Sequence, residues 1–336
     1  MVLLERMGGR ALSFEVYVDD TVRNDCLLRW LIATWAQSEG NGYSLGYEII
    51  GAGQERLRQK RNYMITSKHD QVTNEHENVS TDTRVMKKYS KMTEQQAYSA
   101  GKSGKADLHM HSTYSDGCAT IEEILEHVQQ NTNLDVIALT DHDVIDGSLR
   151  ARDLWARGSY RFDFVVGEEV STNDGHLLGL FIEKVVPAGL SMERSIDLIH
   201  EQGGLAVVAH PLHRFFRHSC KREVLDRIVA TPGVWLDGME TWNASFCGVY
   251  ANYVAMGTNR TVYNIPELGN SDAHMLSAIG RGMTWFEGKS AQDVRATIEA
   301  GVSAPGGKLW GVESYYQWAR YLLNKEQREA RRPALA

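Results

Sequence analysis

Two histidines separated by one residue stand in the stretch 107–117, where an apolar strand gives way to a loop. Because side chains alternate along a strand, His109 and His111 project to the same side and could together hold one metal ion. Asp116, on the turn that follows, adds a carboxylate oxygen that could reach a second ion beside the first. Taken alone, this pattern is explained equally well by solvated imidazoles at a strand end, so its meaning depends on the rest of the chain.

Other places along the chain supply the same kinds of side chain at the ends of expected strands. They are His142, Glu169, His176, His210, and Asp272 with His274. In an α/β barrel the carboxyl ends of the strands converge on one mouth, where residues far apart in sequence become neighbours. Each residue by itself would be an ordinary loop or core polar group. Their appearance at consecutive strand ends favours a shared metal site.

The elements that must position these residues begin near residue 106. A capping box at Thr120 and Glu123, with apolar residues at helical spacing after it, predicts a helix over 121–130. Short apolar runs typical of buried strands alternate with further helices. The expected strands are 135–140, 162–166, 177–182, 205–209, 236–240, 267–269 and 283–286, and the further helices are 192–202, 222–230 and 291–300, the last capped by Ser290. This alternation predicts an α/β barrel or a doubly wound sheet.

The first hundred residues have a different character. One strand over 12–18 and one helix over 21–37 predict a small αβ unit, and 54–105 is polar enough to be a flexible or disordered linker. Its basic residues at 56–61 could contact nucleic acid or an acidic partner, or form a solvated helix face, which is the commoner case. We expect an N-terminal extension over 1–105, the barrel domain over 106–310, and a C-terminal helix or tail over 311–336.

Composition narrows the class of protein. A formal net charge of -7 argues against broad electrostatic binding to nucleic acid and leaves small or terminal phosphates as simpler ligands. Four widely spaced cysteines without a C-x-x-C pair indicate neither a disulfide framework nor a zinc ribbon, so we expect a reducing cytoplasm. The longest early apolar run, 27–36, is too short to span a membrane. Neither of the common glycine-rich nucleotide-binding motifs is present in the sequence.

The polar clusters together resemble a known family. His109-x-His111, 140–143, 167–169 with the later His210, and 271–274 are similar to the four motifs of the polymerase and histidinol phosphatase (PHP) family of metal-dependent phosphoesterases, in order, over about residues 106 to 305. The resemblance implies a distorted seven-stranded, TIM-like β/α barrel with two or three divalent ions at its mouth, commonly manganese, zinc or iron.

Carried onto this chain, the resemblance implies three groups of metal ligands. They are His109, His111, Glu169 and Asp272 for one ion; Asp116, His142 and His274 for a second; and Glu169, His176 and His210 for a third. Glu169 is preferred to Glu168 because the family's bridging glutamate stands two residues before a serine or threonine, here Ser171, and because neighbours along a strand face opposite ways. Asp116 stands where some members have histidine, which hardens the donor set and leans towards manganese.

The expected function is hydrolysis of a phosphomonoester, a nucleotide or a small phosphorylated metabolite, by a metal-bridging hydroxide. The expected catalytic residues are Asp116, His142, Glu169 and His210. Arg214 and Arg281 are candidate phosphate clamps, and Trp242 could stack on a base, although surface and core positions are the ordinary alternatives. The runner-up is a 5'-3' exonuclease or phosphodiesterase on short nucleic acids, and a further rival is a non-catalytic PHP-like binding module.

Two acidic residues beside the histidines have an open role. Asp107 and Asp141 could accept hydrogen bonds from the ligating imidazoles, as metal sites usually require. Hydrogen bonds from each carboxylate to backbone at the strand ends are an equally good alternative.

Overall fold

A computed structural model describes residues 103–213, 216–245, 248–324 and 331, which contain the expected barrel over 106–310 except for 214–215 and 246–247. The strand expected over 12–18, the helix over 21–37 and the basic residues at 56–61 lie outside the described residues. Nine strands form one sheet in the order β7-β6-β5-β4-β3-β2-β1-β8-β9. They are β1 (Gly104–Asp107), β2 (Val136–Leu139), β3 (Asp163–Thr172), β4 (Gly175–Leu180), β5 (Leu205–Val208), β6 (Gly238–Asn243), β7 (Glu267–Asn270), β8 (Gly282–Phe286) and β9 (Ala304–Gly307).

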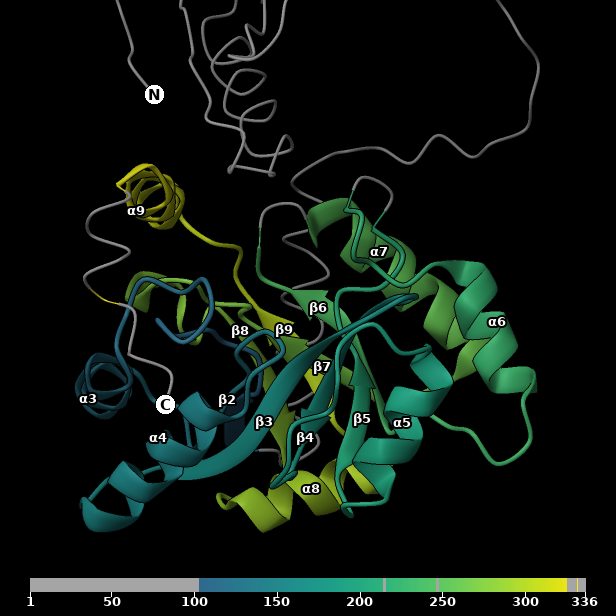
Figure 1. Cartoon of the computed structure of the whole chain (residues 1–336), viewed down its shortest axis with the longest axis horizontal. Coiled ribbons are helices and arrows are strands. Elements are labelled where there is room, and N and C mark those ends of the chain that lie inside the picture. Colours follow the sequence, from purple (N-terminus) through teal and green to yellow (C-terminus); the bar gives the residue numbers. More distant parts are fainter. Residues whose placement is uncertain (1–102, 214–215, 246–247, 325–330, 332–336) are drawn as a thin grey trace, which may run out of the picture. The chain divides into compact units, whose positions relative to one another are not determined.

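Helices surround the strands, as Figure 1 shows. They are α3 (Ile121–Asn131), α4 (Asp146–Arg157), α5 (Met192–His200), α6 (Arg222–Ala230), α7 (Gly248–Thr258), α8 (Ala291–Glu299) and α9 (Val312–Leu323), with a π-helical turn η1 (Asn259–Tyr263) and a 3-10 turn η2 (Leu276–Ala278). The expected helix over 222–230 has the observed bounds of α6, the expected capping box at Thr120 begins α3, and the expected cap Ser290 begins α8, where it forms a capping box with Asp293. In the described part of the chain, no helix combines the length and the apolar character needed to cross a membrane.

The strands are mostly parallel, but two of them run the other way. β1, β2 and β3 pair in parallel, as do β5, β6 and β7. β4 pairs antiparallel with both β3 and β5, and β8 pairs antiparallel with β1 and β9. The distorted α/β barrel is therefore confirmed, with nine strands in place of seven and with two reversed strands that a simple β/α alternation does not contain.

The sheet closes on itself between β1 and β7. Beyond the ends of these strands, Met110 and Ala273 form a parallel bridge, and the N–H of His111 donates to the carbonyl oxygen of Ala273 at 2.9 Å. Within β7, the N–H of Gly269 donates to the Thr284 hydroxyl of β8 at 3.1 Å, and that hydroxyl donates to the Gly269 carbonyl at 2.9 Å. The carboxyl ends of the parallel strands consequently face one common mouth.

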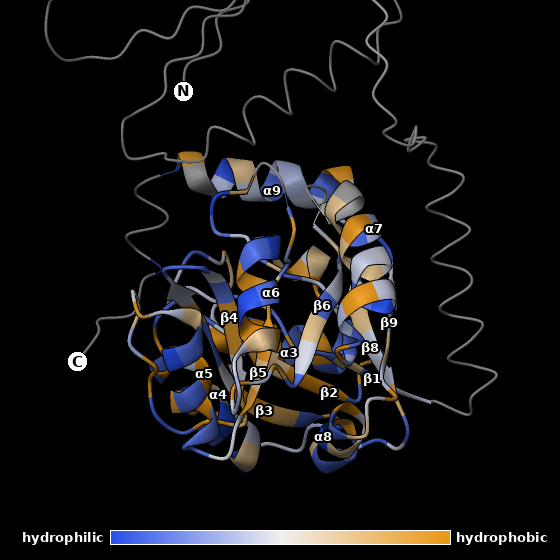
Figure 2. Cartoon of the chain, turned by 90° about the vertical axis from the view of Figure 1, so that its right-hand side faces the viewer, coloured by the Kyte–Doolittle hydropathy of each residue, from blue (hydrophilic) through white to orange (hydrophobic). Residues whose placement is uncertain are grey.

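The opposite end of the barrel is closed by a hydrophobic plug. Strand residues such as Leu108, Leu178 and Phe286 pack in one buried cluster with Val294 and Ile298 of α8. The backbone of α8 is held at this end because the N–H of Ala291 donates to a carboxylate oxygen of Asp163, where β3 begins, at 2.8 Å. Figure 2 shows β2 hydrophobic along its length, whereas α6 carries hydrophilic residues. A filled interior and a blocked base leave the mouth as the place for polar side chains.

Candidate metal centre

The first two histidines reach the mouth on the segment that continues β1. Because His109 and His111 flank Met110, which is bridged to Ala273, both imidazoles project to one side and both are almost fully buried. His142 follows β2, and its backbone bridges that of Glu169 on β3. His176 reaches the same mouth from the start of β4, because β4 runs opposite to its neighbours. The expectation that His176 follows its strand is thus corrected.

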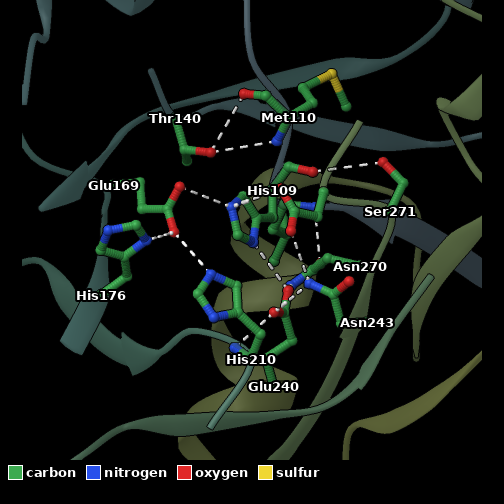
Figure 3. A network of polar contacts seen from close by, with 12 residues as sticks. His109, Met110, Thr140, Glu169, His176, His210, Glu240, Asn243, Asn270 and Ser271 are labelled. Carbon is green, nitrogen blue, oxygen red and sulfur yellow. Dashed lines mark hydrogen bonds and ion pairs between the residues drawn. The ribbon is translucent and has the colours of Figure 1, made fainter. Parts of the chain in front are cut away.

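Glu169 lies at the centre of the cluster. Its Oε2 atom is 3.1 Å from His109 Nε2, 3.2 Å from His111 Nε2 and 3.2 Å from His142 Nδ1. Its Oε1 atom is 2.8 Å from His176 Nδ1 and 3.0 Å from His210 Nε2. Figure 3 shows Glu169 between His109, His176 and His210. One buried carboxylate therefore contacts imidazoles supplied by strands and loops from across the barrel.

A second carboxylate gathers histidines on the open side of the mouth. Asp116 Oδ1 is 3.2 Å from His274 Nε2 and lies 3.9 and 4.0 Å from ring nitrogens of His111 and His142. The N–H at Nδ1 of His274 donates to the backbone carbonyl of Asp272 at 2.9 Å, which leaves Nε2 free to face Asp116. The Asp116 side chain is 42% exposed and that of His142 is 25% exposed, so this side of the cluster is open to solvent.

Asp272 supplies a third carboxylate. Its Oδ1 atom is 3.4 Å from His109 Nε2 and 3.3 Å from His111 Nε2. Asp272 and His210 both adopt left-handed backbone conformations, with φ of 52° and 29°. Residues other than glycine adopt such conformations at an energetic cost, and they often occur at functional sites. The loops after β5 and β7 are thus bent to bring His210 and Asp272 into the cluster.

The side chains fall into sets that suit divalent cations. In each set the candidate ligand atoms lie within 4.8 Å of one another: His111, Asp116, His142 and His274; His109, His210 and Asp272; His109, His111 and Glu169; and His142, Glu169 and His176. All nine expected metal ligands belong to at least one set. The expected division among three ions differs in detail, because the described geometry places His210 with His109 and Asp272, and His176 with His142 and Glu169.

The hydrogen-bonding state of the ligand atoms supports a cation site. His109 Nε2, His111 Nε2, His176 Nδ1 and Asp116 Oδ1 are buried and, in the described chain, make no hydrogen bond. Oxygen atoms do lie near these nitrogens, at 2.8 Å in the case of His176, but the directions do not suit an N–H···O bond. Buried polar atoms without hydrogen bonds are costly, and coordination of a cation satisfies them. The cluster therefore fits divalent metal ions.

The electrostatics of the cluster are strongly perturbed. Burial alone would lower the pKa of His111, but its interactions with Asp272 and Glu169 overcome burial and raise the pKa to about 10. Burial opposes ionisation of Glu169, yet its electrostatic interactions with His142, His109 and His176 hold its pKa well below the usual range. His142 goes the other way, because burial lowers its pKa to about 4. Concentrated negative charge at this mouth attracts cations and protons to the same atoms.

The acidic residues beside the histidines have a structural role. Both oxygens of Asp107 accept backbone N–H groups, from Ser271 at 3.0 Å and Gly280 at 2.8 Å. Asp141 accepts the backbone N–H and the hydroxyl of Ser112, and also the hydroxyl of Ser115, which holds the turn that carries Asp116. Asp107 therefore binds backbone N–H groups, which was the alternative to accepting from a ligating imidazole. Asp141 binds both backbone and hydroxyl groups. A carboxylate outside the metal-binding sets that does contact a ligating imidazole is Glu240, which lies 3.0 Å from His109 and for which the sequence gives only a position at the end of a strand.

Of the three expected substrate-binding residues, the structure describes Trp242 and Arg281. Trp242 is only 4% exposed on β6 and packs in the core, so its expected role in stacking on a base is corrected. Arg281 lies beside the amino end of α9, where its Nε–H donates to the Ser277 carbonyl at 3.4 Å. Its role as a phosphate clamp stays a prediction. Arg214 lies outside the described residues.

Aromatic side chains outside the expected metal-ligand set border the cluster. His218 stacks on His176 with ring centroids 5.0 Å apart, and Phe216 meets His210 edge-on at 5.1 Å. On the other side, Trp318 of α9 lies 5.1 Å from His274. The loop after β5 and helix α9 therefore line opposite sides of the mouth.

Comparisons with known proteins agree with this geometry. Residues 107–208 match the PHP domain family, and residues 257–303 match the PHP-associated family. The uncharacterized protein MJ1587 of Methanocaldococcus jannaschii is 33% identical over 174 residues, which cover 48% of this chain and 94% of that protein. Shorter matches reach several named enzymes.

The phosphoribosyl 1,2-cyclic phosphate 1,2-diphosphodiesterase of Eggerthella lenta is 39% identical over 99 residues, 26% of this chain and 37% of that enzyme. The 5'-3' exoribonuclease Rnm of Escherichia coli is 35% identical over 85 residues, 24% of this chain and 29% of that enzyme. The matches thus span 37% and 29% of the length of these two enzymes.

Proposed function

The chain belongs to the PHP domain family of metal-dependent phosphoesterases, and on this premise we propose that it hydrolyses a phosphomonoester of a nucleotide or another small phosphorylated metabolite. The observation that carries the proposal is the convergence of imidazoles on the buried carboxylate of Glu169, flanked by Asp116 and Asp272. Imidazole with carboxylate is a donor set that suits manganese, zinc and iron(II). Two or three such ions fit the ligand sets.

The residues of the chain have distinct tasks in this proposal. His109, His111, Glu169 and Asp272 would hold ions on the buried side, and Asp116, His142 and His274 on the exposed side, with His176 and His210 completing the cluster. Divalent ions bound there would lower the pKa of a water molecule and neutralise the charge of a phosphate. Because Asp116 and His142 are the more exposed members, the phosphate enters over them, and we assign catalytic roles to these two with Glu169 and His210.

The rest of the mouth supports a small substrate. The loop that carries Phe216 and His218 lies on one side and Trp318 on the other, so the approach to Asp116 is bordered by aromatic rings. A net charge of -7 gives no general attraction for a polyanion. These features favour a single terminal phosphate on a compact molecule over a long nucleic acid.

The experiment starts with full-length protein stripped by a chelator and reconstituted with manganese, zinc or iron(II). Hydrolysis of p-nitrophenyl phosphate, nucleoside monophosphates and nucleoside bisphosphates is compared with that of bis(p-nitrophenyl) phosphate. We expect metal-dependent cleavage of monoesters, its loss in Asp272→Ala, and wild-type rates in His127→Ala, a matched histidine control on α3 that lies outside the cluster. A fully metal-loaded protein that cleaves no phosphoester would refute the proposal in favour of a binding module.

The second candidate is a 5'-3' exonuclease on short nucleic acids, favoured by the match to the exoribonuclease Rnm. It predicts stepwise release of nucleotides from 5'-phosphorylated oligonucleotides. Its affinity would fall steeply with salt, because contacts to several phosphates release counterions. Monoester cleavage without oligonucleotide shortening would exclude it.

A further inference from the structure

A buried carboxylate behind the candidate metal ligands has no ligating role of its own. Glu240 stands on β6 and is 1% exposed. Its Oε1 atom lies 3.0 Å from His109 Nδ1 and accepts from the side-chain amide of Asn270 at 3.0 Å. Its Oε2 atom accepts the backbone N–H of His210 at 2.8 Å and the amide of Asn243 at 2.9 Å. Figure 3 shows Glu240 among these four groups.

Two of the four groups around Glu240 are asparagine side-chain amides whose orientation is fixed by other hydrogen bonds. The oxygen of the Asn270 amide accepts the backbone N–H of Leu108 at 2.9 Å, and that of Asn243 accepts the backbone N–H of Ser245 at 2.9 Å. Both amides must therefore present their NH2 groups to Glu240. The His210 backbone is a donor in every case. A carboxylate held by three fixed donors accepts from the fourth group as well, so His109 presents Nδ1–H to Glu240.

This arrangement decides which nitrogen of His109 is available to a metal. A neutral imidazole with its proton on Nδ1 has its lone pair on Nε2, which faces Glu169 Oε2 and Asp272 Oδ1. The Asn243 amide also donates to Asp272 Oδ2 at 3.1 Å, and so links Glu240 to a second ligand. His210, held through its backbone N–H, is the third. These three ligands form one of the described metal-binding sets.

We propose that Glu240 is a positioning residue for this metal-binding set: it fixes the tautomer of His109 and, directly and through Asn243, the placement of His210 and Asp272. The proposal rests on the proposed function, since it concerns the metal ions of the same site. Carboxylates behind ligating histidines orient the ring and raise its basicity, and their loss commonly weakens metal binding 10- to 100-fold. Glu240 makes one such contact and extends it to two further ligands.

Glu240→Gln is the sharpest test because it changes the chemistry with little change in shape. Glutamine offers one acceptor oxygen to four donors, so its NH2 group must face two of them. If the NH2 group faces His109, the ring moves its proton to Nε2, the atom that must bind the metal. If it faces the other way, the His210 N–H and the Asn243 amide lose their acceptor. Either orientation damages the same ligand set.

The matched control is Glu168→Gln. Glu168 is also buried and lies next to Glu169, but its Oε2 atom accepts only the backbone N–H of Val186, at 2.8 Å, and among the described residues it contacts no imidazole. Asn243→Ala is the second variant, which breaks the link to Asp272 and leaves the contact between Glu240 and His109 intact. It keeps the test decisive if Glu240→Gln does not fold.

Metal binding is measured on chelator-stripped full-length protein by competition with a chromogenic chelator, using Mn²⁺ and Zn²⁺, and by metal content after gel filtration. For Glu240→Gln we expect a 10- to 100-fold loss of affinity, about 1.4–2.7 kcal/mol, confined to one ion. Asn243→Ala should weaken the same ion by less, and Glu168→Gln should bind like the wild type. Long-range ¹H–¹⁵N spectra of histidine-labelled protein should show the Nδ1–H tautomer of His109 in the wild type and its loss in Glu240→Gln.

Three results would overturn the inference. The first is wild-type affinity for every ion in Glu240→Gln, and the second is an Nε2–H tautomer of His109 in the wild type. A uniform loss of affinity for all ions that follows a fall in thermal stability would likewise assign Glu240 a purely structural role. Failure of the wild type itself to bind metal is a different result, because it removes the proposed function.

Discussion

Replacing Glu168 by glutamine should make the stability of the chain less sensitive to alkaline pH. Glu168 and Glu169 are neighbours on β3, and their side chains point to opposite sides of the strand. Glu169 faces the histidines, whereas Glu168 is buried with one hydrogen bond, from Val186, and its Oε1 atom has no partner in the described chain. Burial raises the pKa of Glu168 to about 8. The pKa of Glu169, in contrast, is held well below its usual range by the histidines around it.

The sign and size of the effect follow from proton linkage. Below an ordinary pKa of 4.5, Glu168 is protonated in both the folded and the unfolded chain. As the pH rises from 4.5 towards 8, the unfolded chain releases this proton and the folded chain keeps it, so the free energy of unfolding falls. A pKa raised from 4.5 to about 8 corresponds to a loss of up to about 5 kcal/mol. Glutamine mimics the protonated form, so Glu168→Gln removes the loss.

Urea denaturation in the presence of a chelator measures the free energy of unfolding at several pH values. At pH 5 the wild type and Glu168→Gln should have nearly equal free energies of unfolding, and at pH 8.5 the variant should be more stable by a few kcal/mol. Glu169→Gln should show the opposite sign at neutral pH, because it loses a carboxylate that its imidazole neighbours favour. Parallel pH curves for the wild type and Glu168→Gln would show that Glu168 is ionised in the folded chain and refute the reasoning.

Two further predictions concern metal release and close packing. Lowering the pH from 7.5 to 5 should release bound metal, because protons compete with metal ions for the histidine nitrogens and the pKa of His111 is raised to about 10. Metal content after dialysis at each pH measures the release, and retention of metal at pH 5 would contradict the prediction. Gly282→Ala should destabilise the chain by at least ~1–3 kcal/mol, because its Cβ would overlap the Asn270 carbonyl, whereas Gly257→Ala in α7, with open space around it, should stabilise it by ~0.5–1 kcal/mol in urea denaturation.

Much of the barrel could be predicted because its elements carry local signals. Helix α6 and the capping boxes of α3 and α8 have amphipathic spacing and terminal residues that can be read from sequence. Helix α4 was missed because small residues, Gly147, Ser148 and Ala151, form its buried face and its N-cap residue, Ile145, makes no side-chain cap. The reversal of β4 and β8 depends on pairing across the sheet, which no local pattern records.

The metal ligands of the candidate site could also be predicted from the sequence, but the residues that position them could not. Histidines and acids at strand ends are conspicuous, and the structure brings all nine expected ligands into connected sets. Glu240 and Asn243 were missed because a glutamate and an asparagine within a buried strand gain meaning only once His109, on the segment after β1, is seen to lie 3.0 Å from Glu240. Trp242, conspicuous in sequence, belongs to the core, since its place on β6 decides its exposure and residue type does not.

Three buried carboxylates fix the loops that carry the metal ligands and leave the exposed side of the mouth free to vary in sequence. Asp107 ties down the loop after β7, Asp141 the turn before Asp116, and Glu240 the segments of His109 and His210. Each accepts at least two hydrogen bonds inside the protein, where water cannot replace them, so moving any ligand loop would leave a buried charge without partners. Substrate selection must then lie where these hydrogen bonds end, at the aromatic rings of Phe216, His218 and Trp318 around the mouth. Exchanges there should alter which phosphoester is cleaved without loss of metal, and exchanges among the three buried carboxylates should do the reverse.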